Sequence, residues 1–200
     1  MQSAAFCLCF SNAIIKRKGV FTMLERIRQM ALDSGMYQAE YLNADQIKCY
    51  PEVRQTCEGN VCGNYNKTWT CPPGVGTLAE CEAKLRRFDK MLLFSKKYEL
   101  EDSFDIEGMG EALLDFKKVV EAFDDRIRPV LEEFILLGNE GCDRCGVCTY
   151  PDAPCHFPEL VHHSVSSYGL YVAELAKTAG VNYNNGPDTV TYLGALMVKE

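Results

Sequence analysis

Hydrophobic residues recur along the chain with two different periods, and each period predicts its own kind of element. The clearest run lies between Met109 and Ile127, where apolar residues alternate at spacings of four and three ahead of Pro129. This spacing places the apolar side chains on one face of a helix, which the proline ends or kinks. Thr22 and Thr77 each precede a glutamate by three positions, the capping-box pattern of a helix start. Three further helices are therefore predicted: Met23 to Ser34, Thr77 onward, and Ser164 to Gly180.

Other segments have the short periods or apolar runs that are typical of strands. Residues 36–42 alternate, with Tyr37 and Tyr41 on one face, and segments 90–100 and 189–198 also read as strands. The run 130–138 is ambiguous between helix and strand, and we favour a strand because it leads into a loop. In this order the elements predict an α+β fold, with a small mixed or antiparallel sheet packed against helices. We expect a single domain over residues 23–200, preceded by an N-terminal extension over residues 1–22.

Two stretches, Cys49 to Gly76 and Gly138 to His163, have no regular period and are predicted to be loops. A loop as long as Gly138 to His163 inside a compact domain is either functional or disordered. Elsewhere, the adjacent acids Asp124 and Asp125 point to different sides of any element, so we expect them on a solvated face.

Composition and charge restrict the classes of protein that this chain can represent. Of its 200 residues 47% are hydrophobic, which is typical of a globular protein, and the net charge of -7 argues against nucleic-acid binding. No apolar run approaches the length of a membrane span. The N-terminal segment carries its basic residues after its apolar part, so it does not resemble a secretory signal peptide. Met23 is an alternative start of translation, although starting there would remove the Thr22 cap.

Eleven cysteines are a large number for a chain of this size. Without an export signal we expect a reducing, cytoplasmic setting, in which clustered thiols more often bind metal than form disulfides. Cys142, Cys145 and Cys148 are separated by two residues each, and Cys155 follows six residues later. Thiolates spaced in this way along a winding loop can reach different irons of a cubane, so we predict a four-iron, four-sulfur cluster (4Fe-4S). Zinc is the alternative, although it usually takes two pairs of cysteines from separate segments.

A second set of cysteines, Cys57, Cys62 and Cys71, has wider spacings and precedes two prolines. These residues form a second candidate metal or cluster site, and the rival interpretation is a set of reduced thiols packed beneath Trp69. A cluster with only three cysteine ligands would leave one iron open to a substrate. Cys81 falls on the apolar face of its predicted helix and is expected to be a buried core residue.

Three segments together carry a resemblance to a known family. They are Cys57-x4-Cys62-x2-Tyr65-x3-Trp69-x-Cys71-Pro72-Pro73, then Cys142-x2-Cys145-x2-Cys148-x6-Cys155, then residues 164–183 running into 189–198. The chain resembles, from Met36 to Val198, a family of small predicted metal-binding proteins of unknown function from anaerobic bacteria and archaea. The resemblance implies iron–sulfur or other metal binding through these cysteines, without an established reaction. The chain departs from the family pattern at His156, where arginine is expected, and at Ser166, where an acidic residue is expected.

Three functions follow from these observations as alternatives. The first is an iron–sulfur protein with an electron-transfer or redox-accessory role, which would act with a redox partner protein. The second is an enzyme that binds its substrate at a cluster with an open iron, and the third is a non-catalytic interaction module stabilised by zinc. His156 lies beside Cys155 and is a candidate for proton transfer, although a solvated loop histidine is the simpler interpretation.

Overall fold

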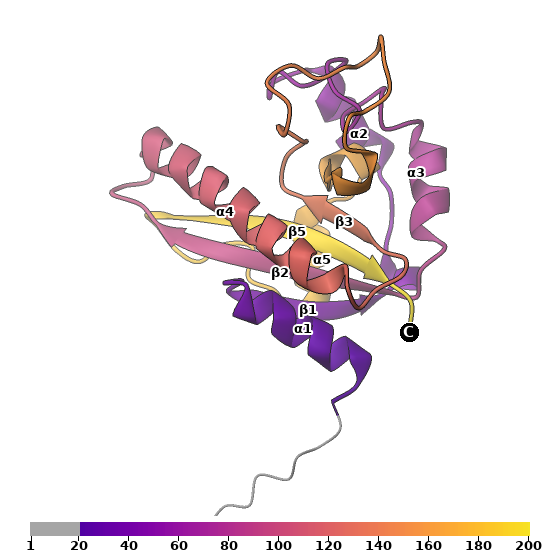
Figure 1. Cartoon of the computed structure of the whole chain (residues 1–200). Coiled ribbons are helices and arrows are strands. Elements are labelled where there is room, and N and C mark those ends of the chain that lie inside the picture. The colour runs from indigo at the N-terminus through magenta and orange to yellow at the C-terminus, as the bar shows by residue number, and fades with distance from the viewer. Residues whose placement is uncertain (1–20) are drawn as a thin grey trace, which may run out of the picture.

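A mixed sheet with helices on both faces organises the protein, and Figure 1 shows its computed structural model. The structure describes residues 21–200. The helices are α1 (Met23–Asp33), α2 (Pro51–Glu58), α3 (Leu78–Leu85), α4 (Ile106–Ile127) and α5 (Val172–Ala179), and the strands are β1 (Gln38–Asn43), β2 (Lys90–Glu99), β3 (Ile135–Gly138), β4 (His163–Ser164) and β5 (Thr189–Val198). Short 3-10 helices cover Ala44–Gln46, Pro158–Leu160 and Ser166–Tyr168.

The sheet has the strand order β1-β2-β5-β3-β4. Its long central pair, β2 and β5, is antiparallel, as are the β1–β2 and β3–β5 pairs, whereas β3 and β4 run parallel at one edge. A parallel pair needs a long crossover connection, and here that connection is the cysteine-rich segment 139–162. The predicted α+β fold with a small mixed sheet is confirmed.

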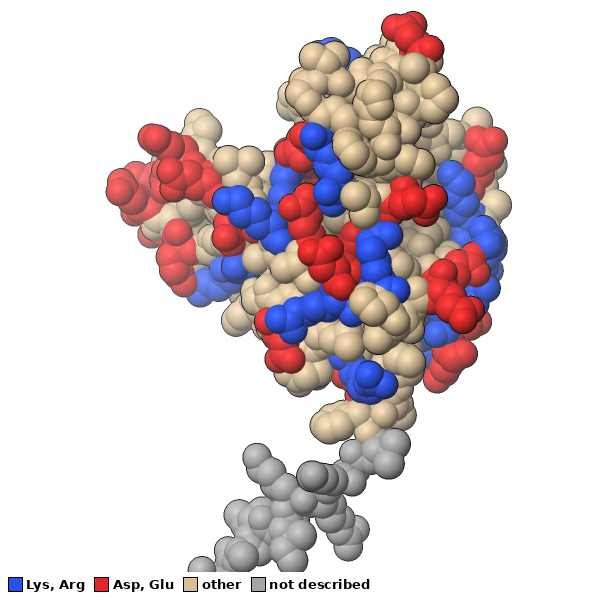
Figure 2. Space-filling view, in the orientation of Figure 1, with Lys and Arg blue, Asp and Glu red and all other residues tan. Residues whose placement is uncertain are grey.

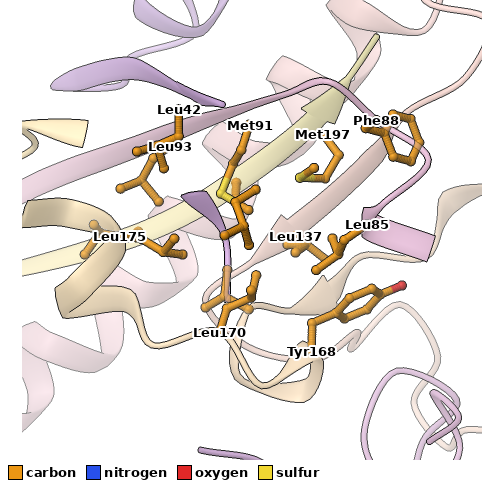
Figure 3. Packing of buried hydrophobic residues seen from close by; sticks show 14 of the residues in the cluster. Leu42, Leu85, Phe88, Met91, Leu93, Leu137, Tyr168, Leu170, Leu175 and Met197 are labelled. Atoms are coloured by element: carbon orange, nitrogen blue, oxygen red, sulfur yellow. The ribbon is translucent and has the colours of Figure 1, made fainter. Parts of the chain in front are cut away.

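Both faces of the sheet are buried, each against its own helices. On β2, Met91 and Leu93 belong to one hydrophobic cluster and Leu92 and Phe94 to the other, as the two-residue period of a strand requires. Helices α3 and α5 pack on the first cluster, part of which is drawn in Figure 3, and α1 and α4 pack on the second. Burial on both faces explains why β2 and β5 read in the sequence as apolar runs with little alternation.

Several sequence predictions of element boundaries are confirmed. Thr22 and Thr77 both form capping boxes with the glutamates three residues later, so α1 and α3 begin where the pattern indicates. Helix α4 ends at Ile127, two residues before Pro129. In the ambiguous run 130–138 the strand interpretation holds for the last four residues, which form β3.

The predicted loop between Cys49 and Gly76 is wrong over part of its length, because it contains helix α2. Pro51 occupies the first turn, where its missing N–H costs no hydrogen bond. The Arg54 guanidinium donates to the backbone carbonyls of Ser167 and Gly76, which lie outside the helix. None of the residues of α2 is buried, so the helix lacks the apolar period by which a sequence pattern is recognised.

The last helix was predicted to begin at Ser164, and this boundary is also wrong. Ser164 ends β4, a 3-10 turn follows, and α5 begins at Val172. Gly169 breaks the helical path with a φ of 70°, in the left-handed region that favours glycine. A Cβ there would lie 3.1 Å from the carbonyl oxygen of Tyr50, so close approach of the two backbones reinforces the requirement for glycine.

Within residues 21–200, no helix combines the length and the apolar composition that crossing a membrane requires. Nearly all of the predicted N-terminal extension, including Cys7 and Cys9, lies outside the described residues. The structure therefore does not test the alternative start of translation at Met23.

Candidate metal centre

The C-terminal cysteine loop leaves the sheet at the end of β3 and returns to it at β4. Leu137 pairs with His163 and Gly138 with Ser164, so the two ends of the loop lie side by side. The backbone N–H of Val165 also donates to the carbonyl of Gly138 at 3.0 Å. A loop closed at its base in this way can hold a defined shape although it has little regular structure of its own.

Four cysteines of this loop line one pocket. They are the four residues predicted as cluster ligands: Cys142, Cys145, Cys148 and Cys155. All four thiols are partly buried, and none forms a disulfide. Trp69, Phe157 and Val161 contribute apolar surface to the same pocket, and the Phe157 N–H donates to the Cys155 sulfur at 3.4 Å. Apolar walls and N–H groups directed at sulfur are the surroundings that tune an iron–sulfur cluster.

Arg144 is the charged side chain of this pocket, and it also fixes the loop to its neighbours. Its Nε donates to the carbonyl of Leu160 at 2.9 Å, and its guanidinium lies 3.4 Å from the Glu121 carboxylate on α4. Burial raises the pKa of the Cys142 thiol, and the positive charge of Arg144 opposes that rise. A cation at this position favours the thiolate form that ligates metal.

The N-terminal cysteines surround a second cavity that is larger and more open. Cys57 lies at the end of α2, Cys62 is exposed and Cys71 is buried, and all three line this cavity. Asn60 and Asn66 adopt left-handed backbone angles and turn the chain between the cysteines. Burial raises the pKa of the Cys57 thiol, and Arg54 opposes that rise.

Polar residues from other parts of the chain also line the second cavity. Glu140, Ser164 and Ser166 all line it. The cavity measures about 350 Å³, within the size range of small-molecule sites. The three cysteines therefore face a space that a small ligand can enter, whereas the four cysteines of the other loop face mainly side chains.

The two cysteine loops, far apart in the sequence, pack against each other at one end of the molecule (Figure 1). The indole Nε1 of Trp69 donates to the carbonyl of Ala153 at 3.1 Å, and its ring meets the Tyr150 ring edge-on with centroids 4.9 Å apart. The Tyr150 hydroxyl donates to the Asn66 side chain at 3.2 Å. Trp69 therefore packs on the other loop and forms part of its pocket.

Charged side chains are sparse on this end of the protein. Segment 59–76 contains Lys67 as its one charged residue, and segment 145–158 contains Asp152. Figure 2 shows this end as a mainly uncharged surface, with acidic and basic residues gathered over the rest of the visible face.

Within residues 21–200, no group of three or more His, Cys, Asp and Glu side chains is arranged to hold a metal ion, and the thiols of each loop stand around a cavity.

A family model described as predicted metal-binding protein (DUF2284) matches residues 40–198. The chain belongs to this family. All seven cysteines that line the two cavities fall inside the matched range. No curated protein and no solved structure matches the chain. The resemblance drawn from the sequence is thereby confirmed.

The two positions at which this DUF2284 member departs from the expected pattern have different surroundings. Ser166 lines the second cavity, so a change there alters the polar wall that faces the three cysteines. His156 is exposed beside Cys155, and its ring lies 6.2 Å from the ring of Phe157. The exposure of His156 agrees with the simpler interpretation of a solvated loop histidine.

The remaining described cysteines lie outside both cavities. Cys81 is fully buried in the core beneath α3, as the apolar face of its helix predicted. Cys49 is half-buried, and its backbone forms an isolated antiparallel β-bridge with Leu170. Burial raises the pKa of the Cys49 thiol to about 11.

One charged group that sequence reasoning misplaced supports the C-terminal loop. Asp124 on α4 was expected on a solvated face, but it is buried and only 1% exposed. Its Oδ2 accepts from Arg128 at 2.6 Å and lies 3.0 Å from Nε2 of His162, the last residue of the C-terminal cysteine loop. Burial alone raises the pKa of this carboxyl, but the hydrogen bonds from His162 and Arg128 outweigh it and hold the pKa below its ordinary value. The four-residue spacing of Asp124 and Arg128 on a helix was the available signal.

Proposed function

We propose that this protein carries a 4Fe-4S cluster on Cys142, Cys145, Cys148 and Cys155, and that it transfers electrons or assists a redox enzyme. The observation that supports this most directly is that four unpaired thiols from one loop line a common pocket. A cubane cluster suits thiolates that stand around a cavity, because its irons occupy separate corners. Family membership supports metal binding in general, and the cluster is our own assignment.

The surroundings of this pocket also suit a cluster that exchanges electrons without changing its ligands. The apolar side chains of Trp69, Phe157 and Val161 limit the access of water, and low solvent exposure shifts a reduction potential. Arg144 places a positive charge next to the thiolates, which offsets part of their negative charge. When bound, the cluster supplies the one-electron chemistry, and the loop supplies its ligands and its shielding.

We propose the cytoplasm as the location, because a reducing compartment keeps such thiols available for metal. The partner would be an electron-carrier protein. The uncharged end of the molecule, which includes the exposed Val61 and Val147 next to the two sets of cysteines, is the surface where such a carrier would approach the clusters.

A second candidate function is an enzyme that binds a small substrate at the three-cysteine site. The observation in its favour is the cavity of about 350 Å³ that Cys57, Cys62 and Cys71 line together with polar side chains. Three thiolates would leave one iron of a cluster without a protein ligand, and that iron can act as a Lewis acid. Glu140 and Ser166, which line the same cavity, would then contact the substrate.

The deciding experiment is metal and acid-labile sulfide analysis of the full-length protein purified without oxygen. We expect brown protein with iron and sulfide in equal amounts, and we expect Cys148→Ser to lose the iron of the C-terminal site. Cys49→Ser is the matched control, because Cys49 lies outside both cavities and its loss should leave the iron content unchanged. Colourless protein with stoichiometric zinc would contradict the proposal and favour the zinc-stabilised interaction module.

A further inference from the structure

The two cysteine cavities share a wall, and this wall consists of two neighbouring pairs of residues. Thr70 and Cys142 line the four-cysteine pocket, whereas Cys71 and Gly141 line the three-cysteine cavity. Each pair of consecutive residues, 70–71 and 141–142, therefore contributes one member to each site. We call these four residues the bridge.

The bridge is closely packed. The N–H of Cys142 donates to the Thr70 hydroxyl at 3.0 Å, and that hydroxyl lies 3.9 Å from the Cys71 sulfur. Thr70 is 1% exposed and Cys71 is 6% exposed, so water is nearly excluded from this contact. A Cβ added to Gly141 would lie 2.8 Å from both the Cys71 sulfur and the Thr70 hydroxyl oxygen. Glycine at position 141 thus allows the backbone of the C-terminal loop, next to Cys142, to lie directly against the Cys71 thiol of the N-terminal loop.

We propose that the two sites form one two-centre redox unit and that electrons cross between them at the bridge. This inference rests on the proposed function, because it requires a cluster at both sites. With clusters held by both sets of cysteines, each transfer would move one electron: one cluster would be oxidised as the other is reduced, and no bond or proton would move. An external electron-carrier protein supplies the electron and takes it up again.

The geometry of the bridge supports direct exchange. Cys71 is a candidate ligand of one site and Cys142 of the other, and they are connected through a single hydroxyl, that of Thr70. Two paramagnetic centres joined by so short a path also interact magnetically, which provides a readout that does not depend on any catalytic activity. The three-cysteine cavity is open and the four-cysteine pocket is walled by side chains, so a substrate at the open site could exchange electrons through the enclosed one.

The test is electron paramagnetic resonance of anaerobically purified protein reduced with dithionite. Cys62→Ser removes a ligand of the first site and Cys148→Ser removes one of the second, and neither residue belongs to the bridge. We expect the wild-type spectrum to differ from the sum of these two single-site spectra by splitting or broadening. A wild-type spectrum equal to that sum, in protein whose iron content corresponds to two clusters, would overturn the two-centre unit.

Two glycines of the same loop provide a matched pair. Gly141→Ala inserts a methyl group into the bridge and should weaken or abolish the magnetic interaction. Gly146→Ala should leave it at the wild-type value, because a Cβ there has no neighbour within 4 Å. Equal interaction in both variants would count against the bridge as the route. Iron at the four-cysteine site alone would overturn the two-centre unit and leave the proposed function standing, whereas protein without iron and sulfide would overturn both.

Discussion

The two cysteine loops differ in what holds them and in what they enclose. The C-terminal loop starts and ends on adjacent parallel strands, and its four thiols face a pocket with apolar walls. The N-terminal cysteines lie at the end of α2, which the Arg54 guanidinium anchors, and in the loop that follows it. Their three thiols range from buried to exposed around an open cavity. A loop closed on the sheet thus builds the shielded site, and a loop that follows a surface helix builds the accessible one.

Of the changes that test this difference between the loops, Asp124→Ala is expected to have the largest effect on stability. The change leaves Arg128 and His162 without their buried partner and should lower the free energy of unfolding by about 3 kcal/mol. Because His162 ends the C-terminal loop, iron at the proposed C-terminal site should become easier to remove with a chelator, while the proposed N-terminal site should change little. Chemical denaturation and chelator kinetics measure the two effects.

Asp125→Ala is the control for this change, since Asp125 is exposed on the same helix. Equal losses of stability in the two variants would show that Asp124 does not anchor the loop.

His163 provides a pH test of the same end of the C-terminal loop. Burial, together with the charges of Lys84 and His162 nearby, lowers the pKa of His163 to about 4, although a hydrogen bond with the Thr70 backbone opposes this shift. Its unfolded-state pKa is about 6.5, so the unfolded chain binds more protons between these values and stability falls as the pH drops through them. Between pH 7 and pH 5 this histidine should account for about 2 kcal/mol of lost stability.

In His163→Gln that part of the loss should be absent. Denaturation curves of both proteins at the two pH values give the difference. Parallel losses in the variant and the wild type would refute a neutral, buried His163.

A smaller effect, this time on both loops, is expected from Thr70→Val. Valine removes the hydroxyl that accepts from the Cys142 N–H and leaves this donor without a partner, at a cost of about 1 to 2 kcal/mol. The change should speed iron release from both proposed sites, because residue 70 lies in their shared wall. Thr70→Ser retains the hydroxyl and should behave nearly as the wild type. An unchanged rate of iron release in Thr70→Val would contradict the proposed link between the loops.

The smallest effect is expected from Tyr150→Phe. The variant loses the hydrogen bond to Asn66 but keeps the ring that packs on Trp69. Since this hydrogen bond is partly exposed, we expect a loss of about 0.5 kcal/mol by chemical denaturation, with iron content unchanged. A loss several times larger would mean that the outer contact, and not the bridge, joins the two loops.

The elements that the sequence predicted correctly are those that pack on the sheet. Helix α4 and strands β2 and β5 bury many apolar side chains, so their secondary structure can be recognised from the spacing of apolar residues in the sequence. Helix α2 was missed because it buries none, and α5 was predicted too long because the left-handed turn at Gly169 interrupts an otherwise helical pattern. Asp124 was placed on the surface because its partner His162 lies 38 positions away.

By itself the sequence determined the α+β fold class, the two capping boxes, the family and the two sets of clustered cysteines, since each depends on residues that are close together in the chain. The tertiary structure alone decided that the two sets share a wall at Thr70 and Gly141, that one cavity is shielded and the other open, and that Asp124 is buried. These features depend on contacts between segments separated by tens of residues, and a local pattern carries no record of a partner so far away.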